Sequence, residues 1–289
     1  MAKSERPSAV EERFYSSETY LSHPGQLFRA MAQDLAKSWE LALRLTIRDF
    51  KAQYRASLAG YLWAFIPPIV ASVTFLLLRK GNVVNFPDTA IPYSVFVFTG
   101  MILWQVFVEA MNSPIKLIQG GKNMLVKLNF PREALLLSAF MQSCIGLLIR
   151  VLILIPFLLL LHPPTEITVL LFPLGGLSLV LLGWTIGIFI SPIGMLYHDI
   201  QRSLTLITTF WMFVTPVVFP IGGHGLVREI VRFNPVTPLL QTSRDWLTGL
   251  QTGLHLEMLI VILLTALALP VGWLFYRIFM PHIIERMGM

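Results

Sequence analysis

Residues 167–194 read ITVLLFPLGGLSLVLLGWTIGIFISPIG, a stretch without a single charged side chain. A bilayer core about 30 Å thick is crossed by roughly 20 apolar residues in a helix, so this stretch is long enough to span a membrane. Five further apolar stretches follow the same pattern. The six predicted spans are 57–78, 93–111, 134–161, 167–194, 204–220 and 256–280. The sequence therefore predicts an all-α integral membrane protein with six transmembrane helices, which acts in transport or in chemistry at a membrane.

The composition of the whole chain agrees with this fold class. Hydrophobic residues make up 55% of the 289 residues and charged residues only 13%, whereas charged residues are about a quarter of an ordinary soluble domain. Cys144 is the single cysteine, and the six histidines are scattered without metal-ligand spacing. A soluble domain is excluded, and neither a disulfide framework nor a metal site is expected.

Positive charge is distributed unevenly along the chain. Lys and Arg are concentrated before residue 57, in 112–133 and near the C-terminus. Because basic residues favour the cytosolic side, both termini are predicted to be cytosolic. The net charge of +6 is explained by this topology, so no nucleic-acid partner is expected. The outer side then holds Arg79, Lys80, Arg228, Arg232 and Arg244.

Two regions precede the predicted membrane domain at 57–289. Residues 1–26 form a polar tail without the apolar core of a secretory signal. Residues 27–56 are predicted to form an amphipathic helix that lies in the inner membrane interface, because apolar and basic residues recur there at helical spacing. It is either an anchor to anionic headgroups or a landing surface for an anionic lipid-linked substrate or a partner subunit. The apolar stripe is Trp39, Leu43, Ile47, Phe50 and Tyr54, and the basic stripe is Arg44, Arg48, Lys51 and Arg55.

Two connections between the spans are longer than simple turns. Segment 112–133 is predicted to be a cytosolic loop, because Gly120 and Gly121 interrupt it before a short helix-compatible piece at 123–128. Segment 221–255 mixes apolar residues with charge, glycine and proline. Short re-entrant or interfacial helices on the outer side suit this second segment better than a plain loop.

Energy for transport has no visible source in this chain. The G-x-x-x-x-G-K-[ST] loop that cradles nucleotide phosphates is missing from the sequence. Ion-coupled carriers usually place carboxylates or histidines at mid-membrane depth, but here only the basic Arg150 is truly internal. ATP hydrolysis is therefore expected on another chain.

The charges on the second and third spans are predicted not to meet. Glu109 lies within one turn of the inner end of its span, whereas Arg150 lies about 24 Å from the inner end of the next one. The expected partners of Arg150 are instead the outer carboxylates Glu229 or Glu257. Contact with a substrate is the alternative role for this arginine.

Aromatic side chains are candidate sugar-binding groups, because sugar rings stack on aromatic faces through their apolar C–H surfaces. The alternative is ordinary packing, lipid contact or a place in an interfacial belt. The candidate pore-lining residues are Tyr61, Trp63, Phe65, Phe98, Trp104, Phe107, Phe210, Trp211 and Phe213.

Small residues repeat along the fourth span at Gly183, Gly187 and Ser191. A face of small residues every fourth position lets two helices approach closely. Packing within the subunit is the favoured interpretation, and a dimer seam is the alternative.

Several short motifs occur in a recognisable order across residues 44–250. They are RDFKAQYRAS at 48–57 with Gly60 and Trp63, Pro92-Tyr93 with Phe96, Gly100, Trp104 and Phe107, NMLVK at 123–127, FPRE at 130–133, then Trp211, Pro216, Pro220 and Asn234-Pro235. In this order they closely resemble permease subunits of bacterial ABC exporters for lipid-linked polysaccharides. That family includes O-antigen, capsule and teichoic acid exporters.

The resemblance implies a homodimer of six-span subunits around a central channel in the bacterial cytoplasmic membrane. Two separate ATPase subunits would dock beneath it and bind ATP and Mg, so this chain would hold no cofactor and no catalytic residue. Segment 221–255 would form an outer gate. The residues coupled to the ATPase would be Asn123, Met124, Leu125 and Lys127 of a coupling helix, with Asp199 in a second short loop.

The substrate expected from this resemblance is an undecaprenyl-pyrophosphate-linked glycan entering from the inner leaflet. Its pyrophosphate would be attracted to Arg48, Lys51 or Arg55, since arginine and lysine both bind phosphate well. One alternative is an ABC permease for another amphiphile, such as a drug or a simple lipid. A polytopic glycosyl- or acyltransferase is a further one, although no convincing catalytic pair is seen, and a structural scaffold is the last.

Overall fold

The computed structural model describes residues 24–55, 63, 66–83, 89, 91–121, 125, 131–161, 167–197, 199–221, 226–249 and 251–288. Every regular element in these ranges is a helix, which confirms the all-α prediction. The elements are α2 (Pro24–Arg55), α3 (Ile66–Lys80), α4 (Tyr93–Gly120), α6 (Glu133–Leu161), the short 3-10 helix η2 (Ile167–Leu171), α7 (Phe172–Leu196), α8 (Asp199–Val214), α9 (Leu226–Phe233), α10 (Val236–Thr248) and α11 (His255–Gly288).

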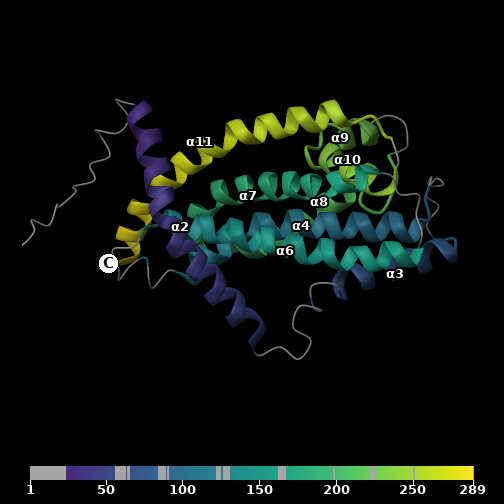
Figure 1. Ribbon diagram of the computed structural model, residues 1–289, viewed down its shortest axis with the longest axis horizontal. Helices are drawn as coiled ribbons and strands as arrows, with labels where there is room; N and C mark the ends of the chain where they lie inside the picture. The colour runs from purple at the N-terminus through teal and green to yellow at the C-terminus, as the bar shows by residue number, and fades with distance from the viewer. Residues whose placement is uncertain are drawn as a thin grey trace, which may run out of the picture.

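The long helices form a bundle, and other helices cover its two ends. Helices α4, α6, α7 and α11 run along the long axis, α2 crosses one end, and α9 and α10 lie at the other end (Figure 1). Helix α4 packs against α3, α6, α7, α8 and α10, and most of its side chains are buried. It is therefore the central helix of the subunit.

Four stretches among the described residues are long and apolar enough to cross a membrane. They are Tyr93–Gly120, Glu133–Pro156, Ile167–Leu196 and His255–Arg286, and they match four of the six predicted spans. The predicted spans 57–78 and 204–220 correspond to α3 and α8, which have 15 and 16 residues. Residues 56–62, 64 and 65, at the start of the first predicted span, lie outside the described part of the chain.

Helix α4 continues to Gly120, beyond residue 111 where the second span was predicted to end. The first part of the predicted loop 112–133 is therefore helix. The polar residues that marked the expected end are buried: Asn112 donates a hydrogen bond to the carbonyl oxygen of Val108 (2.8 Å), and Ser113 donates one to that of Ala139 (3.0 Å). Polar side chains mark the end of a span only where they face water. Here their hydrogen-bond partners are backbone carbonyls of α4 and α6.

Small residues bring α7 against α4. A Cβ atom on Gly183 or Gly187 would overlap the backbone carbonyl oxygens of Phe107 and Met111, respectively. The two helices therefore approach along this face more closely than side chains would permit. This contact confirms the interpretation that the small residues of the fourth span pack within the subunit.

Helix α2 presents three different faces. Ser38, Ala42 and Leu45 are buried, and Thr46 and Ser138 of α6 share a hydrogen bond of 3.0 Å. The predicted apolar stripe is another face, on which Trp39, Leu43 and Ile47 are exposed. The third face carries the basic stripe. The exposed apolar stripe is the surface that an interfacial helix offers to lipid.

Ion pairs join α2 to the inner ends of α6 and α11. Arg277 of α11 bonds to Asp34 of α2 (2.7 Å) and lies 3.7 Å from Glu133 of α6. The hydroxyl of Tyr276 donates to the carbonyl oxygen of Arg132 (3.2 Å). The crossing helix is thus fixed to two helices of the bundle.

Candidate functional site

Segment 221–255 forms two short helices, α9 and α10, and α10 carries a buried arginine. Arg244 is fully buried. Its guanidinium donates hydrogen bonds to the carbonyl oxygens of Pro216 (3.2 Å) and Val217 (3.0 Å) and to the side-chain oxygen of Gln241 (3.0 Å). Helix α10 is thereby tied to the turn that follows α8.

The floor of this arginine site is one face of α4. The guanidinium carbon of Arg244 lies 3.7 Å from the centroid of the Phe96 ring, a cation–π contact. A Cβ on Gly100 would overlap both the guanidinium and the carbonyl of Val217, so only glycine leaves room here. Tyr93 donates a hydrogen bond to the next carbonyl in this turn, that of Val218 (2.9 Å).

Asn234 closes the same junction from the start of α10. Its carbonyl oxygen accepts hydrogen bonds from the indole N–H of Trp211 (3.1 Å) and the backbone N–H of Val236 (3.1 Å). Its amide donates to the hydroxyl of Thr215 (2.7 Å). We call this cluster the outer junction. It comprises Tyr93, Phe96, Gly100, Trp211, residues 215–218, Asn234 and Arg244.

Burial shapes the titration of the two charges on α10. Burial lowers the pKa of Arg244 to about 9, against the opposing effect of Asp245, so the guanidinium stays charged at neutral pH. Burial also raises the pKa of Asp245, while hydrogen bonds from the hydroxyl (2.5 Å) and N–H (2.8 Å) of Thr252 oppose that rise. Both charges have fixed partners, as buried charges normally do, although Nε of Arg244 and Oδ1 of Asp245 are buried without a hydrogen-bond partner among the described residues.

Sequence reasoning placed Arg244 only among the outer charges and missed its structural role. One signal was present, because Tyr93, Phe96 and Gly100 recur at spacings of three and four and must share a face of α4. The distant residues Val217, Val218 and Arg244 meet that face, which the linear sequence does not reveal.

The predicted pore-lining aromatics fall into three groups. Trp104 and Phe107 are buried and pack with Trp211 of α8, at centroid distances of 6.3 and 5.3 Å from its ring. Phe98 is buried as well. Tyr61 and Phe65 lie outside the described residues. Of the predicted pore-lining aromatics, Trp63, Phe210 and Phe213 are exposed, at 59%, 71% and 55% of their surface.

The exposed side of α8 mixes aromatic and hydroxyl-bearing residues. Phe210 and Phe213 share it with Ser203, Thr205 and Thr209. A helix surface that faces only lipid is normally apolar throughout. The exposed surface of α8, which also carries Leu206 and Ile207, therefore mixes apolar and hydrogen-bonding groups.

The prediction that Glu109 and Arg150 cannot pair was wrong. Nη2 of Arg150 lies 2.5 Å from Oε2 of Glu109, and neither Glu229 nor Glu257 is its partner in the structure. The depth argument failed because α4 extends to Gly120, which places Glu109 about 16 Å from the inner end of its helix rather than within one turn. Two long side chains span the remaining difference.

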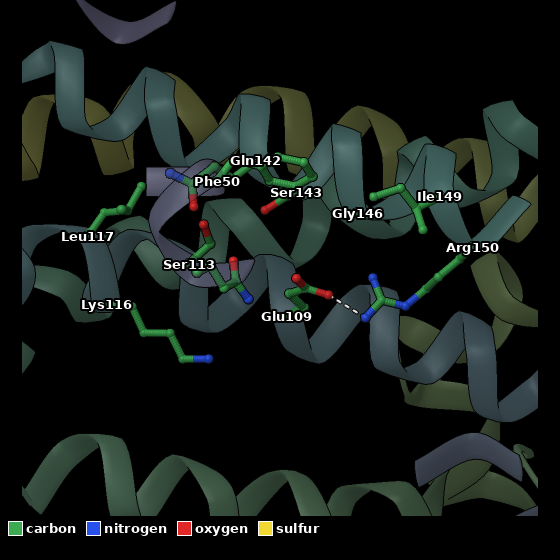
Figure 2. A pocket seen from close by; sticks show the side chains of 11 residues that line it. Phe50, Glu109, Ser113, Lys116, Leu117, Gln142, Ser143, Gly146, Ile149 and Arg150 are labelled. Carbon is green, nitrogen blue, oxygen red and sulfur yellow. Dashed lines mark ion pairs between the residues drawn. The ribbon is translucent and has the colours of Figure 1, made fainter. Parts of the chain in front are cut away.

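The pair lies in a polar cavity of about 140 Å³ between α2, α4 and α6. Figure 2 shows the side chains of Glu109 and Ser113 on α4 facing Gln142 and Ser143 on α6. Phe50 and Gln53 of α2 close its inner end. This cleft is lined by both polar and charged side chains within the bundle.

The remaining predicted residues lie at the inner end. Arg48 bonds to the neighbouring Asp49 (2.7 Å), and Lys51 and Arg55 are exposed. Asp199 begins α8 and lies 3.9 Å from Arg202. The positions 123, 124 and 127 of the predicted coupling helix fall outside the described residues.

Leu125 is the described residue of that predicted coupling helix, and it is buried. It belongs to a hydrophobic cluster with Leu45 of α2, Leu135 of α6 and Met280 of α11. Leu125 therefore shares one buried cluster with residues of three other helices.

A bundle of long apolar helices, with an amphipathic helix across one end and short helices at the other, has the architecture of a multi-pass membrane protein. Comparison with known families agrees: residues 40–248 match the ABC-2 type transporter model, and the chain belongs to that family. It is therefore a multi-pass protein of the bacterial inner membrane.

Individual relatives are named as O-antigen export and polysialic acid transport proteins. The chain is 25% identical over 222 residues to the O-antigen export system permease protein RfbA of Myxococcus xanthus, covering 73% of this chain and 81% of the relative. It is 24% identical over 221 residues to the protein of the same name from Klebsiella pneumoniae, covering 74% and 83%. The polysialic acid transport protein KpsM of Escherichia coli is 22% identical over 209 residues, covering 70% and 78%. These likenesses confirm the resemblance drawn from the sequence motifs.

Proposed function

We propose that this chain is the channel-forming permease subunit of an ATP-driven exporter for undecaprenyl-pyrophosphate-linked polysaccharide. Two copies form the channel, and α3 and α8 complete six spans in each. Two separate ATPase subunits bind ATP and Mg from the cytosol. The relatives support the polysaccharide class, because they are O-antigen and polysialic acid transport proteins.

The observation that carries the proposal is the exposed mixed surface of α8. Phe210 and Phe213 stand beside threonine and serine hydroxyls on a helix of the membrane domain. In a channel this surface offers a sugar chain both stacking faces and hydrogen-bonding groups. Trp63 adds an exposed aromatic before α3.

Coupling to ATP hydrolysis would enter at the inner end. A partner that pushes on the segment around Leu125 also pushes on α2, α6 and α11, because their side chains share one buried cluster. Asp199 at the start of α8 offers a second exposed contact. At the far end, the outer junction would hold α10 as a gate until α8 moves.

Two other functions predict different behaviour. A permease for a drug or simple lipid would not require stacking surfaces, and a glycan would not stimulate its ATPase. A polytopic transferase needs a catalytic acid, base or metal at the interface. Glu109 is engaged with Arg150, and Asp49 and Asp199 each lie beside an arginine.

Replacing Phe210 and Phe213 together with leucine should lower ATP-driven export of the polysaccharide about threefold or more, since ring stacking is lost while apolar surface is kept. Export is measured as glycan that reaches the far side of proteoliposomes. Phe279→Leu on α11 is the matched control, because Phe279 is also exposed but belongs to a different helix. Equal export by all variants would contradict a stacking role for α8.

A further inference from the structure

The cleft between α2, α4 and α6 has polar walls on helices that are otherwise apolar. Glu109, Ser113 and Lys116 follow one another at spacings of four and three along α4, and Gln142, Gly146 and Arg150 follow along α6. Side chains at these spacings share a helix face. Two polar stripes therefore face each other, from the end next to α2 to the depth of Arg150 (Figure 2).

Arg150 is incompletely satisfied at the deep end of this cleft. Its side chain is only 9% exposed, and Glu109 is the partner of one terminal nitrogen. Its Nε is buried and has no hydrogen-bond partner among the described residues. A guanidinium carries five N–H donors, so this cation, which lines the cavity, has donor capacity beyond its pair with Glu109.

Gly146 leaves the space in which the pair lies. A Cβ on this residue would come within 3.1 Å of Nη1 of Arg150 and 3.4 Å of a carboxylate oxygen of Glu109. The Glu109 side chain is more accessible than its partner, at 39% exposed, while its paired oxygen Oε2 is buried. Glu109 can therefore turn toward water, whereas Arg150 is fixed in the wall.

The charge balance of the cleft favours an anion. Arg150 and Lys116 oppose the single carboxylate of Glu109 among the residues that line it. At its inner end the cleft meets the last turns of α2, where Lys51 and Arg55 are exposed. Arginine binds phosphate by paired hydrogen bonds and lysine by point charge.

We propose that this cleft binds the phosphate group of a membrane lipid, held by Arg150 and Lys116 with its acyl or prenyl chain in the bilayer. Glu109 is the internal competitor that occupies Arg150 when no phosphate is bound. The lipid is either the pyrophosphate-linked carrier, in which case the inference rests on the proposed function, or an ordinary anionic phospholipid.

A competitor and a structural partner respond differently to mutation. If Glu109 serves only to neutralise Arg150, then Glu109→Gln and Arg150→Gln both damage the same contact. If Glu109 competes with phosphate, Glu109→Gln frees the guanidinium and leaves the fold intact, while Arg150→Gln removes the binding group. The two substitutions then change lipid affinity in opposite directions.

The test measures lipid binding to the purified full chain in complex with its ATPase, without nucleotide, by native mass spectrometry. The probes are phosphatidylglycerol, undecaprenyl pyrophosphate and the phosphate-free undecaprenol. We expect Arg150→Gln to weaken binding of at least one phosphate lipid about tenfold or more, and Lys116→Gln to weaken it about threefold. Glu109→Gln should match or exceed the wild-type affinity, and undecaprenol should not distinguish the variants.

Arg286→Gln, on the exposed inner end of α11, is the matched control for loss of a surface cation. Lys116 is exposed at the rim of the cleft, so its variant still tests the site if Arg150→Gln fails to fold. The proposal is overturned if Lys116→Gln behaves like Arg286→Gln, or if Glu109→Gln weakens binding as much as the loss of Arg150.

The two lipid sources separate in the same experiment. If binding of undecaprenyl pyrophosphate depends on Arg150, the cleft is assigned to the substrate carrier. If only binding of phosphatidylglycerol depends on Arg150, the cleft is assigned to a resident lipid. Because no transport or ATP hydrolysis is measured, failure here leaves the exporter proposal standing, and failure of glycan-stimulated ATP hydrolysis leaves a phospholipid site standing.

Discussion

Replacing Arg244 with leucine should destabilise the subunit by about 3–5 kcal/mol, which is the cost of breaking a buried, charge-assisted hydrogen-bond cluster. The carbonyl oxygens of Pro216 and Val217 lose their buried donor. The ring of Phe96 also loses its cation. The change is measured as unfolding of the purified protein in detergent, followed by circular dichroism.

Two further substitutions make this result specific to the outer junction. Arg232→Leu on the exposed face of α9 should change stability by less than about 0.5 kcal/mol. The stability of Arg244→Lys should lie between those of Arg244→Leu and Arg232→Leu. One ammonium cannot reproduce the guanidinium geometry that donates to two carbonyls. If the Arg244→Leu and Arg232→Leu variants have the same stability, the outer junction does not hold α10 in place.

Replacing Gly187 with leucine should cost about 3 kcal/mol or more, because overpacking forces two helices apart. Even the first atom of a side chain there would overlap the carbonyl oxygen of Met111, and it would lie 3.0 Å from ring carbons of Pro114. Backbone and proline ring cannot move aside as a flexible side chain does. Thermal unfolding in detergent measures the effect.

Gly120 provides the matched control for this substitution. It ends α4, and a Cβ built on it meets nothing within 4 Å. Gly120→Leu should therefore leave stability almost unchanged, or raise it slightly because leucine favours a helix more than glycine does. Equal destabilisation by both changes would mean that the α4–α7 contact is looser than described.

The helices themselves could be predicted because long apolar runs determine them. The fourth and sixth predicted spans agree with α7 and α11 to within a few residues at most boundaries, and Gly183 and Gly187 correctly predicted a close helix contact. The end of α4 was missed because Asn112 and Ser113 were treated as facing water. A sequence shows polarity but not which neighbour satisfies it.

The sites were predicted less well, because they depend on which helices become neighbours. Glu109 and Arg150 were separated by an argument about depth that assumed a short α4. Trp104 was proposed to line a pore, yet it is buried against Trp211. Arg244 looked like an ordinary outer charge until the turn after α8 supplied carbonyl partners. The exposed Phe210 and Phe213 keep their predicted role as a proposal.

The most direct test of the exporter proposal is vanadate-sensitive ATP hydrolysis by this chain co-expressed and purified with its ATPase, with and without lipid-linked glycan. We predict a stable complex whose hydrolysis rises when the glycan is added. A chain that binds no ATPase would contradict the account, as would a complex that responds to simple amphiphiles but not to glycan.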